Sequence, residues 1–246
     1  MPEHNILICN DRDALNRKAA QLIAQLSEQA IDVGKRCMLA LSGGSTPKLL
    51  YELLATPEWS GRIDWAKTYL FWGDERYVPP DDPQSNYRMV KEALLSKVAI
   101  PAANVHRVHT ELPSAEDAAT TYERALREVF DTNKTPQFDI ILLGLGENGH
   151  TASLFPYTTV LKDDAHDFAA CYVDEVKQYR LTLTAPVINY ARNVIFLVSG
   201  ASKASVLKEV LYGDYVPDRL PAQLIKPVSG SLIWLVDKPA AAQISK

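Results

Sequence analysis

Apolar runs of strand length alternate with amphipathic stretches of helical length along almost the whole chain, and this alternation limits the fold more than any other feature. Strands joined through a helix run parallel, and their sheet needs helices on its faces. The expected strands are Ile6–Cys9, Cys37–Leu41, Thr68–Trp72, Val105–Val108, Phe138–Leu143, Tyr179–Thr184, Val194–Val198 and Leu232–Val236. The expected helices are Asp13–Ile31, Pro47–Leu54, Asn86–Val98, Ala115–Phe130 and Ser202–Leu211. The pattern predicts an α/β fold, a mostly parallel sheet with helices on both faces.

No linker or internal repeat divides the 246 residues, of which 47% are hydrophobic, so we expect a single domain over residues 1–246. The formal net charge of -4 argues against a nucleic-acid partner, which needs clustered basic charge. The chain does not start like a secretory signal, and no apolar run approaches the ~20 residues that span a bilayer. We therefore expect a cytoplasmic protein without a membrane partner, either a monomer or a small homo-oligomer.

The chain has five histidines and three cysteines, and neither type shows the spacing of a metal site. The sequence also contains no nucleophile elbow of the kind found in serine hydrolases. We therefore expect no metal and no cofactor.

Ligands of open α/β sheets bind outside the carboxyl ends of the strands, so the loops that follow strands carry the information about function. The first such loop is Ser42-Gly43-Gly44-Ser45-Thr46-Pro47. We expect Ser45 or Thr46 to cap the next helix, with Pro47 in its first turn. Free backbone N–H groups at that helix start would suit a phosphate, although an ordinary capped turn explains the motif equally well.

The second loop is Trp72-Gly73-Asp74-Glu75-Arg76, followed by Ser85-Asn86-Tyr87. Packing explains three successive charged residues poorly. Arg76 could bind a phosphate or carboxylate through two hydrogen bonds, with Asp74 or Glu75 orienting it. The alternative is a solvated turn with a surface ion pair.

The third loop runs from Gly144 through Gly146 and Gly149 to His150, and Pro156 follows shortly after. Its glycine spacing matches a dinucleotide fingerprint, but Pro156 leaves no room for the long helix that such a site needs. What remains is a glycine-rich loop that presents a histidine. A helix start close to His150 would disfavour the charged imidazole and keep it neutral, as a general base must be.

The fourth loop is Ser199-Gly200-Ala201-Ser202-Lys203. Lys203 falls in the first turn of the following helix, where its charge opposes the helix dipole by about 0.3–1 kcal/mol. A bound anion would reverse that cost, but a solvated lysine remains an alternative.

Together these motifs closely resemble the 6-phosphogluconolactonase family. The matching stretches are Leu41–Pro47, Trp72–Arg76 with Ser85–Tyr87, Gly149–Pro156 and Ser199–Lys203. The resemblance implies a modified Rossmann-like α/β fold, shared with glucosamine-6-phosphate deaminases and ribose-5-phosphate isomerases. It also implies hydrolysis of 6-phospho-D-glucono-1,5-lactone, the second step of the oxidative pentose phosphate pathway, so that the partner is a small phosphorylated sugar lactone.

The resemblance further implies roles for individual residues. His150 would be the general base, with Asp74 and Glu75 as further catalytic candidates. The residues implied in substrate binding are Ser42, Gly43, Gly44, Ser45, Thr46, Arg76, Asn86, Gly146, Gly149, Thr151 and Lys203. One position departs from the family: Asn148 stands where an Asp is usual, so the partner that would orient His150 carries no charge, and Glu147 is a candidate substitute.

Two other functions remain open from the sequence. An isomerase or amino-sugar deaminase could share the fold, although the deaminases carry an Asn-Glu-Pro ending where this chain has Ser153-Leu154-Phe155-Pro156. A non-catalytic sugar-phosphate-binding regulator would need a DNA- or partner-binding element, which the sequence does not show.

Overall fold

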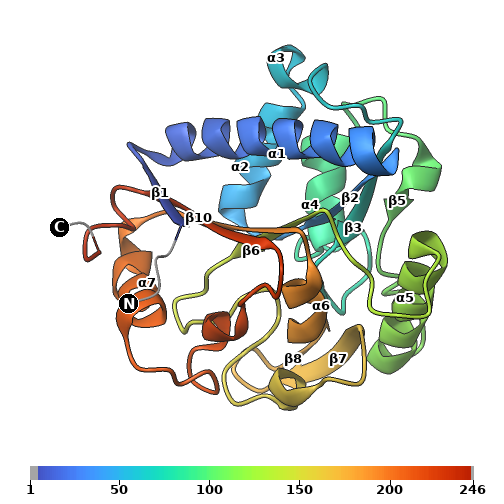
Figure 1. Cartoon of the computed structure of the whole chain (residues 1–246). Helices are drawn as coiled ribbons and strands as arrows, with labels where there is room; N and C mark the ends of the chain where they lie inside the picture. The colour runs from blue at the N-terminus through green and yellow to red at the C-terminus, as the bar shows by residue number, and fades with distance from the viewer. Residues whose placement is uncertain (1–4, 245–246) are drawn as a thin grey trace.

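The computed structural model describes residues 5–244, so the outermost residues of the predicted 1–246 domain lie outside the described range. Within that range seven strands form one parallel sheet (Figure 1). In spatial order they are β1 (Asn5–Cys9), β10 (Ser231–Asp237), β9 (Asn193–Val198), β6 (Ile140–Gly144), β2 (Cys37–Leu41), β3 (Thr68–Trp72) and β5 (Val105–His106). The predicted parallel sheet is confirmed.

Helices cover both faces of this sheet, as predicted. Helices α1 (Arg12–Gly34) and α2 (Ser45–Leu54) lie on one face, and α6 (Ala185–Tyr190) and α7 (Ala204–Tyr212) lie on the other (Figure 1). The Asp11 side chain caps α1 by accepting from the Ala14 N–H at 2.8 Å. No helix within residues 5–244 is both long and apolar enough to cross a membrane.

A second, antiparallel sheet of three strands lies beside the first in the described chain, and the sequence does not predict it. It consists of β4 (Asp74–Arg76), β8 (Gln178–Leu183) and β7 (Phe168–Val173). The strand expected over Tyr179–Thr184 exists as β8, but not in the parallel sheet. Only the turn at residues 174–177 separates β7 from β8, and so short a connection forces antiparallel pairing. Small residues inside β7, such as Ala169 and Ala170, hide its strand character.

Several predicted elements differ in extent. The helix expected over Asn86–Val98 is α4 (Asn86–Val90), continued by a π-helical turn at Lys91–Leu95. The helix expected over Ser202–Leu211 begins with a 3₁₀ turn, Ala201–Lys203, before α7. The helix expected over Ala115–Phe130 is present as α5 with the same bounds.

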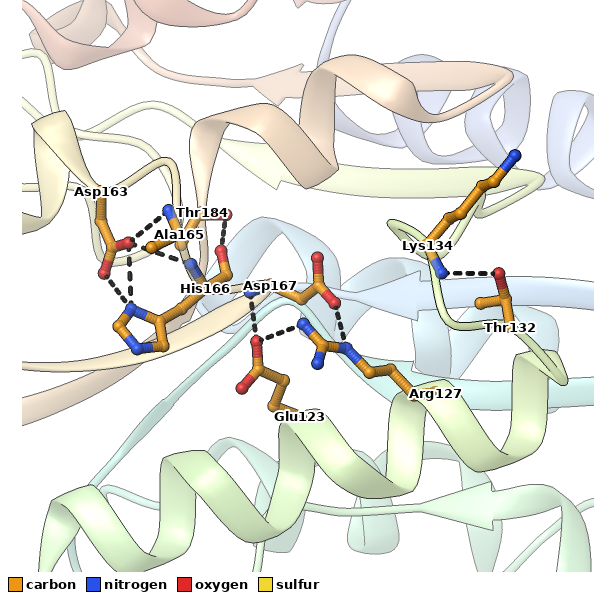
Figure 2. A network of polar contacts seen from close by, with 9 residues as sticks. All are labelled: Glu123, Arg127, Thr132, Lys134, Asp163, Ala165, His166, Asp167 and Thr184. Carbon is orange, nitrogen blue, oxygen red and sulfur yellow. Dashed lines mark hydrogen bonds and ion pairs between the residues drawn. The ribbon is translucent and has the colours of Figure 1, made fainter.

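A polar network fastens α5 to the start of β7 (Figure 2). Glu123 and Arg127 project from α5 toward Asp167 (Figure 2). The Arg127 Nε donates to Asp167 Oδ2 at 2.9 Å, and the Asp167 N–H donates to Glu123 Oε1 at 2.6 Å. Thr184, directly after β8, donates through its hydroxyl to the His166 carbonyl at 2.8 Å. These bonds tie the start of β7 both to α5 and to the end of β8.

The strand order reverses between β2 and β6, and the two strands separate at their carboxyl ends. After β2 the chain adds β3 and β5 on one side, and it then returns to place β6 on the other. Only Leu39 with Ile140 and Ala40 with Ile141 pair across β2 and β6. Such a reversal point leaves a crevice outside the strand ends, which is where α/β proteins bind their ligands.

Candidate active site

A cleft of about 410 Å³ lies at this reversal point. The loops after β2, β6 and β9 line it, and the second sheet closes it through β4, β8 and the turn between β7 and β8. The predicted site residues in its lining are Ser42, Gly43, Gly44, Ser45, Thr46, Asp74, Arg76, Gly146, His150 and Lys203. The predicted residues outside the lining are Glu75, Asn86, Gly149 and Thr151.

The loop after β2 offers free backbone donors to the cleft. The Tyr51 hydroxyl, fully buried on α2, accepts from the Ser42 N–H at 2.9 Å and donates to the Ser42 carbonyl at 2.8 Å. Helix α2 begins at Ser45 after Gly44, whose φ of 102° suits glycine and which supplies no side-chain cap. The expected cap by Ser45 or Thr46 is therefore wrong, because both lie inside the first turn. The uncapped N–H groups remain available for an anion.

His150 lies in the glycine-rich loop after β6, held on three sides. Its ring stacks on Phe155, with centroids 4.1 Å apart, and its Nδ1 lies 2.6 Å from Asn148 Oδ1. Gly146 lies directly against the ring, since a Cβ there would come within 2.1 Å of Nδ1. Among the described residues, His150 Nε2 has no hydrogen-bond partner. This nitrogen is the atom that can exchange a proton with a ligand in the cleft.

The environment keeps the imidazole neutral, but not for the predicted reason. No helix starts in the described segment 150–156, where Thr151 and Leu154 instead form an isolated bridge. Burial, and after it the charges of Lys203, Arg180 and Arg76, together lower the pKa of His150 to about 4. The neutral base therefore results from desolvation and three nearby cations rather than from a helix dipole.

Arg180 on β8 is a charged cleft residue that sequence reasoning missed. It is 9% exposed and lies directly opposite Arg76 in the pairing of β4 with β8. Like charges at directly opposed positions destabilise a sheet, and no ion pair joins either arginine to a carboxylate in the described part of the chain. In the sequence, the sole indication of Arg180 is that it is the one charged residue of the predicted strand Tyr179–Thr184. Its cross-strand partner is visible only in the fold.

The cations differ in how they are held. The Arg76 Nη1 donates to the Gln84 carbonyl at 2.6 Å. The sequence suggested that Asp74 or Glu75 orients this guanidinium, but neither forms an ion pair with it. The Lys203 Nζ lies 3.7 Å from Glu147, a weak and largely exposed contact. Glu147 is thus directed at Lys203 and does not replace the missing Asp beside His150.

The remaining predicted residues support the cleft from behind. The Thr151 hydroxyl donates to the Gly144 carbonyl at 2.9 Å, which satisfies the end of β6. The Asn86 amide donates to the Asp74 carbonyl at 2.9 Å and lies so close to Gly43 that a Cβ there would overlap it. Asp74 itself lines the cleft, and its Oδ2 accepts from the Ser153 hydroxyl at 2.8 Å.

Glu75 points away from the cleft and serves as an anchor for α4. Its carboxylate accepts from the N–H groups of Asn86 and Tyr87 at 2.7 Å each and from the Arg76 N–H at 2.8 Å. The side chain is 1% exposed, and burial raises its pKa to about 7 although these donors lower it. The geometry favours a structural role over a catalytic one.

Glu75→Ala should lower the free energy of unfolding by at least about 2 kcal/mol, because several buried N–H groups lose their acceptor at about 1–3 kcal/mol each. Denaturant unfolding measures this loss. Glu92→Ala is the matched control, since Glu92 forms a surface ion pair with Arg88 on the same segment and should change the free energy of unfolding much less. Equal losses in the two variants would contradict the anchoring role.

Comparison with known proteins agrees with this geometry. The sequence model described as glucosamine-6-phosphate isomerases/6-phosphogluconolactonase matches residues 10–234. A 6-phosphogluconolactonase from Synechocystis sp. is 42% identical over 99% of this chain and 98% of its own, and one from Nostoc sp. is 40% identical over 96% of each. The solved structure of 6-phosphogluconolactonase from Trypanosoma brucei covers 99% of both chains with a TM-score of 0.87 and 30% identity. The chain belongs to the glucosamine-6-phosphate isomerase/6-phosphogluconolactonase family.

Proposed function

We propose that this chain is a 6-phosphogluconolactonase that hydrolyses 6-phospho-D-glucono-1,5-lactone to 6-phospho-D-gluconate. The observation that carries the proposal is a neutral imidazole with a free Nε2, set in a cleft with three cations. The names of the full-length relatives support the same activity. A phosphorylated sugar lactone needs both features, because its phosphate requires positive charge and its ester requires a base.

His150 acts on water in this proposal. Its Nε2 accepts a proton as the water oxygen bonds to the lactone carbonyl carbon, and the imidazolium then returns the proton to the ring oxygen as the C–O bond breaks. Burial still disfavours the imidazolium when the phosphate offsets the nearby cations, so the proton is readily passed on. Backbone N–H groups of the glycine-rich loops stabilise the negative charge on the carbonyl oxygen.

The phosphate is held by Arg76, Arg180, Lys203 and the loop Ser42–Thr46. A dianion would neutralise the like-charged pair on β4 and β8 and occupy the uncapped start of α2. Binding energy from this remote group positions the ester against His150. Asp74 offsets part of the charge of Arg180 and holds Ser153, while Glu75 and Asn86 support the cleft without touching the substrate.

The proposal includes the second step of the oxidative pentose phosphate pathway as the biological role and the cytoplasm as the compartment. A single functional domain over residues 1–246 and a state of monomer or small homo-oligomer remain predictions, as does activity without metal or cofactor. Residues 5–244 contain no group of three or more His, Cys, Asp or Glu side chains placed to hold a metal ion.

His150→Asn should lower kcat for the phosphorylated lactone by about 10²–10⁴-fold, because it removes the general base. The rate is measured above the spontaneous hydrolysis, with amino-sugar phosphate deamination assayed in parallel to test the related activity. Circular dichroism and thermal unfolding check that the variant folds. A folded variant with wild-type kcat would reject His150 as the base.

The pH profile of kcat/KM should show an acid limb whose midpoint lies near the pKa of His150 in the enzyme without substrate, at about 4. The active form is the unprotonated imidazole, so activity should rise through this pH and stay constant toward neutrality. Lys203→Ala should move the midpoint upward, because it removes one of the charges that lower this pKa. A wild-type midpoint near 6.5 would contradict the role of burial and nearby cations.

Arg76→Ala, Arg180→Ala and Lys203→Ala should each weaken binding of the phosphorylated lactone roughly ten- to a hundredfold, the range for a charge-assisted hydrogen bond. Hydrolysis of the unphosphorylated lactone should change much less, since both substrates share the same ester. Lys177→Ala is the matched control, because Lys177 is exposed near the cleft but does not line it. Equal losses on both substrates would assign the residue to the chemical step or to the fold.

A further inference from the structure

The turn between β7 and β8 supplies a carboxylate that is connected to His150 through the neutral amide of Asn148. Glu175 and Val176 in this turn line the cleft, although the turn belongs to the small sheet and lies far from the glycine-rich loop in sequence. The Asn148 Nδ2 donates to Glu175 Oε2 at 2.7 Å. The same Asn148 side chain contacts the His150 ring, so a continuous chain of hydrogen bonds runs from Glu175 to His150.

The Glu175 carboxylate and the His150 backbone N–H together determine which way the Asn148 amide faces. A carboxylate can only accept hydrogen bonds, so the Asn148 atom that faces Glu175 must be the NH₂ group. The amide oxygen then faces His150, where it receives the backbone N–H at 3.1 Å and lies 2.6 Å from Nδ1. A flipped amide would direct its oxygen at the carboxylate and its NH₂ at a backbone N–H, and both contacts would be repulsive.

The amide in turn determines the tautomer of the imidazole. Because the amide oxygen can only accept, the proton of neutral His150 must reside on Nδ1. Nε2 then keeps its lone pair, which is the form that can accept a proton from water. With the opposite tautomer Nε2 would already carry a proton, and His150 could not act as a base.

We propose that Glu175 is a positioning residue, which fixes the Asn148 amide and thereby the His150 tautomer that leaves Nε2 unprotonated. The inference rests on the proposed function for its catalytic consequence but not for the tautomer itself. A carboxylate at position 148 would accept through both oxygens and would need no such orientation. The requirement for Glu175 therefore follows from the asparagine in this chain.

Glu175→Gln tests the proposal with the smallest change of shape. Glutamine can donate as well as accept, so the His150 backbone N–H remains as the one contact that directs the Asn148 amide, and the preference for one orientation weakens. Two-bond proton–nitrogen NMR of histidine-labelled protein, without substrate at pH 7, should show the proton on Nδ1 in the wild type and a mixture of tautomers in the variant. In steady-state assays kcat should fall about two- to tenfold, the range for one neutral hydrogen bond, and KM should not rise.

Two comparisons separate positioning from other roles. Asp174→Asn removes an equal charge from the same turn without touching Asn148, and it should leave both the tautomer and kcat unchanged. In an Asn148→Asp background, Glu175→Gln should no longer lower kcat, because both oxygens of the new carboxylate accept and no orientation has to be selected. Lys203, Arg180 and Arg76 face His150 identically in all these variants, so their effect on the ring cancels.

Three results would overturn the proposal. A pure Nδ1–H tautomer in Glu175→Gln would show that the amide needs no carboxylate. An equal loss of kcat in the Asn148 and Asn148→Asp backgrounds would show that Glu175 acts on the substrate or on the fold. A rise in KM with unchanged kcat would assign Glu175 to binding. If the wild type failed to hydrolyse the lactone, the proposed function would fall, while the NMR result would still decide the tautomer.

Discussion

The separation of β2 from β6 at their carboxyl ends is the constraint on which the site depends. Where the strands part, backbone groups lose their ladder partners and must be satisfied in another way. The Tyr51 hydroxyl takes both groups of Ser42, and the Thr151 hydroxyl takes the Gly144 carbonyl. These hydroxyls satisfy the backbone groups of Ser42 and Gly144 at the point where the strands part. The uncapped N–H groups at the start of α2 remain free and face the cleft. The cavity is therefore a consequence of strand order.

The cleft gathers three positive charges around one neutral imidazole. Arg76 and Arg180 oppose each other across two strands, Lys203 also lines the cleft, and all three disfavour a charged His150. An empty cleft stores this repulsion. A phosphate would relieve it and would also make protonation of His150 less costly once the substrate is in place. In the proposed function, substrate binding and basicity are coupled through the same three charges.

The small antiparallel sheet has a larger part in the site than its size suggests. It supplies Asp74 and Arg76 from β4, Arg180 from β8, and Glu175 from the turn between β7 and β8. The hydrogen bonds of Glu75 to α4 and of Arg127 to Asp167 hold this sheet in place from outside the cleft. These contacts hold the second sheet where its side chains meet those of the main sheet at one imidazole.

The sequence by itself determined the parallel sheet, the helices on both faces, the family and the loops that supply most of the cleft lining, because periodicity and short motifs depend on neighbouring residues. Ser42–Thr46, Arg76, His150 and Lys203 each follow a strand, and parallel strands end at one edge of the sheet. Only the tertiary structure decided that β8 leaves the main sheet, that Arg180 opposes Arg76, and that Glu175 reaches Asn148. It also decided that Glu75 is an anchor and that His150 is neutral through burial. These outcomes depend on pairings between segments far apart in the chain and on exclusion of water, neither of which local sequence patterns encode.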